Sequence, residues 1–230
     1  AIQSADREMN LIAGITESAG ANIQWIQDQF FSSEKEKYGD KIFDYMDEVI
    51  KKIPPGSDHL ICTPWMLGER CPVSSTTTRA TLFNISMVHT REHLMRAVYE
   101  GIGYNLRWIL ENYSRDYGFS CDDFRIIGGG ALDDAWMQII ADITGKRFSV
   151  VKDPRNAGAV GAAIVALIGL GELPGFGSAK DFVQVEKHYE PDPVNRKIYN
   201  DLFDDYKNVY YALEGAYIKA NGDRFKGEEQ

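Results

Sequence analysis

The chain has 230 residues and 44% hydrophobic residues, enough for one sizeable core, which excludes a disordered segment or a small disulfide scaffold. Its 25 Lys and Arg against 34 Asp and Glu give a net charge of -9 and a pI near 5.0, which argues against a broad nucleic-acid interface. The longest apolar stretch, residues 157–171, is rich in Ala and Gly and too short to span a bilayer. We therefore expect neither a nucleic acid nor a membrane as a partner.

Cysteine usage and the first residues predict a cytoplasmic protein. Cys62, Cys71 and Cys121 are odd in number and show no CxxC spacing. Residues 1–8 lack the hydrophobic segment of a signal peptide. Because the chain begins with Ala instead of Met, we expect it to be processed or cut from something longer.

The first third of the chain predicts two helices followed by two strands. Apolar residues recur at helical spacing in residues 17–31 and again in residues 34–53, where Pro54-Pro55-Gly56 ends the second helix. Residues 59–65 are short, apolar and bounded by proline, which is typical of a buried strand. After a polar loop, residues 80–85 return to strand character.

The middle of the chain predicts one long helix and then a strand, a turn and a helix. The long helix is capped by Thr90 and stopped at Gly118. Residues 124–127 are typical of a buried strand, the glycine turn 128–130 follows, and an amphipathic helix runs through Ile143.

The last part of the chain predicts a strand and two more helices. Residues 147–151 form the strand, and residues 157–170 form a helix so rich in Ala and Gly that it must lie very close to a neighbouring backbone. Apolar residues at helical spacing over 193–217 predict a final helix. This order implies an α/β domain whose sheet has covered faces. We expect one domain over residues 1–220 and a frayed tail over 221–230.

Residue types alone point to few candidates for chemistry. Glycines 128–130 let a ligand approach the backbone, and the following helix favours anions, but a tight structural turn is an equally good interpretation because no dinucleotide or phosphate-loop pattern is complete. Asp133 and Asp134 are more typical of helix caps than of acids at work. His89 and His93 have the spacing of a two-histidine metal site without a third ligand. We assign no catalytic and no metal-binding residue.

Several segments together resemble the carboxy-terminal half of the FGGY carbohydrate kinases, the group that includes xylulose, gluconate, ribulose and glycerol kinases. Residues 68–72, Gly-Glu-Arg-Cys-Pro, resemble the GERxP element of xylulose-kinase-like members, and residues 93–101 are similar to the second family signature. Residues 156–163 resemble the closing small-residue helix. Asn84 stands where the family usually has Gly, a departure that concerns the local turn.

The resemblance extends to a nucleotide site. Residues 128–131 look like the adenosine-binding turn of the family, and residues 17–25 are similar to its second nucleotide segment. The resemblance implies that Gly129, Gly130 and Ala131 of the turn face the adenosine and that Asp134 makes a polar contact. It also implies that Gly20 and Gln24 of the second segment border the phosphates and ribose.

The resemblance further implies an actin-like, ribonuclease-H-like α/β domain, with a mixed sheet and helices on both faces, that closes with a second domain around ATP and a sugar. In this family the catalytic carboxylate, most of the sugar pocket and an Asp that helps place Mg²⁺ belong to the amino-terminal half. We therefore expect the isolated chain to be inactive.

The expected parent is an ATP-dependent kinase of xylulose or a related ketose or polyol. It would bind ATP or ADP with Mg²⁺, and its sugar through the amino-terminal domain. Two alternatives remain: a non-catalytic nucleotide-responsive interaction module, and, least favoured, an unrelated α/β enzyme using His89 or a cysteine. A homodimer and the identity of the sugar stay open.

Overall fold

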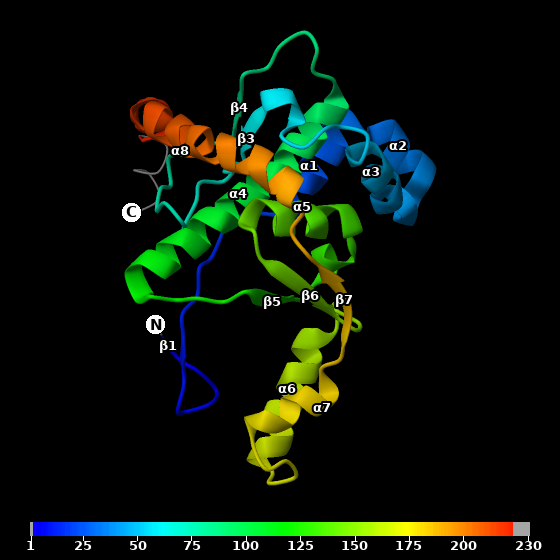
Figure 1. Ribbon diagram of the computed structural model, residues 1–230, viewed down its shortest axis with the longest axis vertical. Helices are drawn as coiled ribbons and strands as arrows, with labels where there is room; N and C mark the ends of the chain where they lie inside the picture. The colour runs from blue at the N-terminus through cyan, green and yellow to red at the C-terminus, as the bar shows by residue number, and fades with distance from the viewer. Residues whose placement is uncertain (1, 223–230) are drawn as a thin grey trace, which may run out of the picture.

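The computed structural model describes residues 2–222. Helix α4 (Arg91–Tyr117) runs through the middle of the molecule, and α1, α3, α5 and β3 all pack against it (Figure 1). Thr90 and His93 form a capping box at its start, and Gly118 ends it at a φ of 63°. The predicted caps are therefore confirmed, because a residue with positive φ cannot continue a right-handed helix.

The segment before β3 differs from the prediction in two respects. A two-stranded hairpin precedes three helical segments instead of two. The elements are β1 (Ile2–Gln3), β2 (Asn10–Leu11), α1 (Gly20–Phe30), α2 (Ser32–Tyr38), the 3-10 turn η1 (Gly39–Lys41) and α3 (Ile42–Ile50). The single helix expected over 34–53 is wrong because Gly39 adopts a φ of 53° and breaks it.

The two strands that follow are confirmed. After the 3-10 turn η2 (Ser57–His59), the fully buried β3 (Ile61–Thr63) pairs antiparallel with β4 (Thr81–Phe83). Asn84 comes next with a φ of 68°, and its Nδ2 donates to the carbonyl of His59 at 3.1 Å. Asparagine tolerates this left-handed conformation, so the turn has a backbone that a glycine would also adopt.

The three-stranded sheet is mixed, as expected. Strand β5 (Asp123–Ile126) lies parallel to β6 (Arg147–Val151), and β7 (Val185–Tyr189) lies antiparallel on the other side of β6. Helix α5 (Asp134–Thr144) packs against β6 and β7. The predicted strand is confirmed, but its complete burial is wrong: β5 is an edge strand. Phe124 and Ile126 are half-buried against the core, Asp123 and Arg125 are exposed, and Ile127 just after the strand is exposed.

Helix α6 (Ala157–Gly169) also corrects a prediction. It extends away from the sheet together with η4 (Phe176–Ser178) and α7 (Ala179–Phe182) (Figure 1). Ile164 is its single buried residue, and a Cβ added at Gly158 or Gly161 would meet nothing within 4 Å. No element of residues 2–222 supplies the close neighbour that its small residues predicted.

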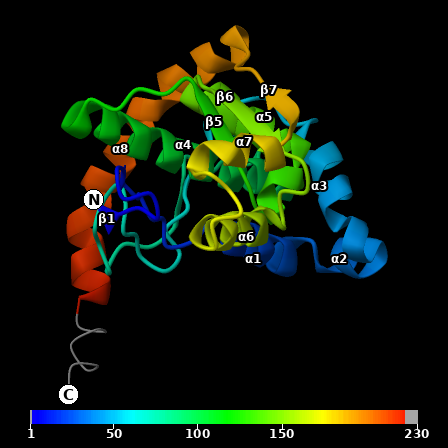
Figure 2. The same ribbon diagram turned by 90° about the horizontal axis from the view of Figure 1, so that it is seen from below.

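Helix α8 (Pro193–Asn221) confirms the last predicted helix. It packs against α5 and β3, on the opposite side of the molecule from α2 and α3 (Figure 2). Its aromatic side chains enter the core, where the Tyr206 ring contacts those of Trp65 and Tyr104. The helix includes Asn221, which donates to the carbonyl of Thr77 at 2.9 Å; the rest of the expected tail, 223–230, lies outside the described residues.

A buried polar network joins α8 and α4 to the turn before β3. Glu100 of α4 accepts hydrogen bonds from Arg96 at 2.7 Å, from the Tyr199 hydroxyl at 2.9 Å, and from Gly56 N–H and the Ser57 hydroxyl at 2.9 and 2.8 Å. The Glu100 charge is thereby compensated, as a buried carboxylate requires.

Candidate functional site

The glycine turn between β5 and α5 is built by one contact with a distant segment and by two local features. Gly128 adopts a φ of 97°, and its N–H donates to the carbonyl of Pro154 at 2.8 Å. The chain then makes the 3-10 turn η3 (Gly129–Leu132). Asp133 accepts the N–H of Trp136 at 2.8 Å, so the predicted helix-capping role is confirmed for Asp133.

A cavity of about 400 Å³ opens beside this turn, between the start of α1, the segment from η1 into α3, and the start of α5. We call it the glycine-turn cavity. Its walls are largely apolar, with aromatic rings from α3 and α5, and three carboxylates and one guanidinium also line it. The lining residues are Gly20, Ile23, Asp40, Phe43, Asp44, Gly129, Gly130, Leu132, Asp133, Trp136 and Arg155.

Three of the six predicted site residues line this cavity: Gly20, Gly129 and Gly130. Ala131 is buried beneath the turn, and Gln24 is exposed one turn further along α1. Asp134 is turned toward β7, where it accepts from Lys187 at 2.8 Å and from the Tyr189 hydroxyl at 2.5 Å. The structure thus brings the two predicted nucleotide segments together. It adds Phe43 and Trp136, which no local pattern marked, and Asp133, for which the sequence predicted only a capping role.

The cavity-lining glycines differ in what surrounds them. A Cβ on Gly130 would lie 2.6 Å from Cζ3 of Trp136, so the absence of a side chain there lets the indole pack on the turn. A Cβ on Gly129 would meet no protein atom within 4 Å, and Gly129 has no strained φ. Gly129 therefore has space for a ligand atom above it, whereas Gly130 is required by the protein itself.

Asp133 combines its capping role with an unusual charge state. Burial, and then the neighbouring carboxylate of Asp47 of α3, raise the pKa of Asp133 to about 8. Its Oδ2 is buried, and so is the hydroxyl of Tyr99, which lies beside it. Two carboxylates this close cannot both be ionised, so Asp133 carries a proton at neutral pH.

Asp134, the next residue, behaves in the opposite way. Partial burial acts to raise its pKa, but the hydrogen bonds from Lys187 and Tyr189 prevail and lower it. Asp134 is therefore ionised at neutral pH and contributes an exposed ion pair between α5 and β7.

The Gly-Glu-Arg segment holds the start of α1 in place. The buried Glu69 carboxylate accepts the N–H groups of Glu17 and Arg70, both at 2.8 Å, and the amide of Asn105 at 3.1 Å. Burial raises the pKa of Glu69 against these hydrogen bonds. Because Glu17 lies just before Gly20, Glu69 acts as a positioning residue for one wall of the cavity.

His93 in the first turn of α4 and His89 just before α4 both have structural partners. His93 Nε2 lies 3.1 Å from the Asp58 carboxylate, and His89 Nε2 lies 3.2 Å from the Asp58 carbonyl. Within residues 2–222, no three His, Cys, Asp or Glu side chains are grouped so that they could hold a metal ion.

In the same part of the chain, every helix is too short or too polar to cross a membrane.

Comparison with known proteins gives the family. The sequence profile described as "FGGY family of carbohydrate kinases, C-terminal domain" matches residues 3–170. The chain belongs to the FGGY family of carbohydrate kinases. The segments that resemble this family, from the start of α1 to α6, all fall within the matched range.

Individual FGGY kinases are similar over most of this chain. A xylulose kinase of Bacillus subtilis is 34% identical over 86% of this chain and 38% of its own length. A gluconokinase of Bacillus licheniformis is 29% identical over 91% of this chain and 41% of its own length. The crystal structure of a xylulose kinase from Rhodospirillum rubrum superposes with a TM-score of 0.76 at 28% identity, over 89% of this chain and 40% of that one. The FGGY chain thus spans about two fifths of the length of these relatives.

Proposed function

We propose that this FGGY domain is the nucleotide-binding half of an ATP-dependent sugar kinase and that the glycine-turn cavity takes the adenosine. The observation that carries the proposal is the meeting of Gly20 with Gly129 and Gly130 around one cavity. These residues belong to the two segments that resemble the nucleotide segments of the family, and they are far apart in the chain.

The chemistry of the cavity suits a nucleoside. Phe43 and Trp136 offer rings against which a base can pack. The carboxylates of Asp40 and Asp44 can accept hydrogen bonds from an amino group or from ribose hydroxyls. Arg155 at the rim carries the positive charge that phosphates require.

Magnesium and the sugar are assigned to no residue of this chain. Nucleotide-bound Mg²⁺ needs only one or two protein carboxylates in addition to the phosphates and water, and a base for the sugar hydroxyl must lie opposite the nucleotide. We infer that the remainder of a longer protein supplies both, so the isolated domain is inactive. The exposed apolar helix α6 is consistent with a further part of the protein covering it.

The longer protein phosphorylates a sugar hydroxyl, and xylulose or a related ketose or polyol is our first choice of substrate. The support is the 34% identity to a xylulose kinase, with a gluconokinase at 29%. In an assay coupled to ADP formation, the longer protein is expected to consume ATP with one of xylulose, ribulose, gluconate or glycerol. Turnover with none of them would refute the kinase proposal.

Calorimetric titration of this chain with Mg-ADP tests the nucleotide site directly. Gly129→Ala adds a methyl group into open cavity space, and overpacking of about 1–3 kcal/mol corresponds to a loss of ADP affinity of about 5- to 150-fold. Gly158→Ala is the matched control, because its methyl group also meets nothing within 4 Å and Gly158, on α6, is absent from the cavity lining. Equal affinities of the two variants would place the nucleotide elsewhere.

A further inference from the structure

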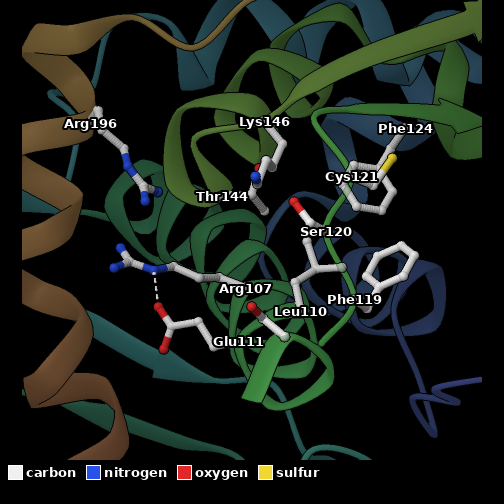
Figure 3. A pocket seen from close by; sticks show the side chains of 11 residues that line it. Arg107, Leu110, Glu111, Phe119, Ser120, Cys121, Phe124, Thr144, Lys146 and Arg196 are labelled. Atoms are coloured by element: carbon white, nitrogen blue, oxygen red, sulfur yellow. Dashed lines mark hydrogen bonds and ion pairs between the residues drawn. The ribbon is translucent and has the colours of Figure 1, made fainter. Parts of the chain in front are cut away.

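A second cavity, of about 210 Å³, lies where the later part of α4, the segment 118–122, the end of α5 and the start of α8 meet (Figure 3). We call it the α5-end cavity. The glycine-turn cavity lies at the first turn of α5, and this one lies at its last turn. The 11 residues of α5 separate the two by about 16 Å.

Three cationic side chains from separate parts of the chain converge on the α5-end cavity. Arg107 comes from α4, Lys146 follows α5, and Arg196 comes from α8, whereas Glu111 is the single carboxylate of the lining. Glu111 is held by Arg107 at 3.0 Å. Lys146 pairs with Asp122, whose side chain is 89% exposed, so that pair is weak. The lining thus carries three cations against one carboxylate, in a chain of net charge -9.

Arg196 is the cation whose charge is least compensated. Among residues 2–222, no carboxylate lies within 4 Å of its guanidinium, and only its Nη1 has a hydrogen-bond acceptor, the carbonyl of Ile143. Burial, and then the positive charge of Arg107, lower the pKa of Arg196. Its guanidinium lies on Gly145, where a Cβ would approach Cζ to 2.6 Å. The group is therefore held in place at an electrostatic cost.

Capping of α5 explains only part of this arrangement. Arg107 also approaches the Ile143 carbonyl, at 3.5 Å, so two guanidiniums serve one helix end. The same Nη1 of Arg107 donates to Asn200 at 2.8 Å, and its guanidinium lies over the Phe203 ring, 4.0 Å from the centroid. Capping uses Nη1 of Arg196 and leaves its Nε and Nη2 without an acceptor in the described chain. Figure 3 shows Arg107 and Arg196 together on one side of the cavity, with Lys146 and the Ser120 hydroxyl across from them. Helix capping requires none of the groups on that second side.

We propose that the α5-end cavity binds a small phosphate-type oxyanion through Arg196, Arg107 and Lys146. The planar guanidinium fork matches two oxygens of such an anion, and the ammonium and the Ser120 hydroxyl can reach the others. The volume equals that of about seven waters in the liquid, which is room for an oxyanion and part of its hydration shell. A doubly negative ligand relieves the repulsion between the two guanidiniums.

Inorganic phosphate is the probe for this site. The 230-residue chain is titrated with phosphate by calorimetry, against chloride at matched ionic strength. Arg196→Met keeps the aliphatic stem and removes the fork, and it is expected to weaken phosphate binding about tenfold or more. Lys197→Met is the matched control, since it removes an equal charge from an exposed neighbour on α8 that is absent from the cavity lining.

Arg196→Met could weaken phosphate binding by disturbing the end of α5, which Arg196 caps. Lys146→Met separates the two causes, because Lys146 does not cap α5. It is expected to bind phosphate more weakly than the parent chain while its circular dichroism stays unchanged. The proposal is overturned if chloride gives the same heat as phosphate, if Lys197→Met loses as much affinity as Arg196→Met, or if Lys146→Met and Arg196→Met both bind like the parent. The last outcome would place any bound phosphate elsewhere, such as beside Arg155.

Discussion

Replacing Asp133 with Asn is expected to stabilise this domain and to flatten its response to pH. The buried Asp133 has a folded pKa of about 8 beside Asp47, whereas an aspartate in an unfolded chain has a pKa of about 3.9. Asparagine presents the same oxygen to the N–H of Trp136, so the helix cap is kept. Its amide can donate to Asp47, which replaces the shared proton by a permanent hydrogen bond.

The sign and the size of the pH dependence of the unfolding free energy follow from proton binding to Asp133. Between pH 4 and pH 8 the folded domain holds a proton on Asp133 that the unfolded chain has released, so the free energy of unfolding falls as pH rises. The slope is at most about 1.4 kcal/mol per pH unit, or about 4 kcal/mol between pH 5 and pH 8. This contribution is full below the unfolded pKa and is lost as pH rises through the folded pKa. Asp133→Asn removes this dependence of stability on pH, and its gain in stability over the parent chain is largest at pH 8.

Urea unfolding at pH 5, 7 and 8 measures both quantities, and the neighbouring residue supplies the control. Asp134 has a lowered folded pKa, so its contribution is present above the unfolded pKa and is lost as pH falls. Asp134→Asn should therefore destabilise at pH 7, by less than about 1 kcal/mol because the pair is half exposed. If the parent and Asp133→Asn lose stability in parallel between pH 5 and pH 8, no buried proton is present.

Three further substitutions test the packing around α4, each by urea unfolding at pH 7. Glu100→Gln leaves the buried guanidinium of Arg96 without its counter-charge and is expected to cost about 3 kcal/mol or more. Gly101→Ala places a Cβ 2.2 Å from the carbonyl oxygen of Cys62, so α4 must move off β3 at a cost of about 3 kcal/mol. Asn84→Val forces a β-branched residue to a φ of 68° and should cost about 1–2 kcal/mol.

A control substitution for each of these three variants tests whether the named contact causes the loss of stability. Glu48→Gln removes one partner of an exposed pair with Lys51 and should change stability by less than about 0.5 kcal/mol. Gly158→Ala adds a methyl group with no contacts and should be neutral or stabilising. Asn84→Gly keeps the left-handed turn and should stay close to the parent. A control as destabilising as its partner would show that the named contact is not responsible.

Much of the fold could be predicted from neighbouring residues. Thr90 and Gly118 bracket α4 because a helix cap is made within one turn of the chain. The glycine turn and the cap at Asp133 are equally local. The break at Gly39 was missed because glycine is tolerated within helices, and only the observed φ shows that the helix ends there.

Other features were decided by tertiary structure alone. The Ala and Gly content of α6 indicated close packing, but whether a neighbour is present depends on which elements surround the helix. Gly20 and Gly129 meet because α1 and α5 both pack on α4. The shared proton of Asp47 and Asp133 requires α3 to pack beside the start of α5.

The sequence by itself pointed to the family, to the long helix α4 with both of its ends, and to two of the segments that line the glycine-turn cavity, because motifs and caps are short and local. Only the folded chain decided which side chains face that cavity, that Asp133 is protonated, and that Arg107 and Arg196 lie together at the far end of α5. The physical reason is that pKa shifts and cavities depend on distances between elements, and these distances are set by the packing of the whole core.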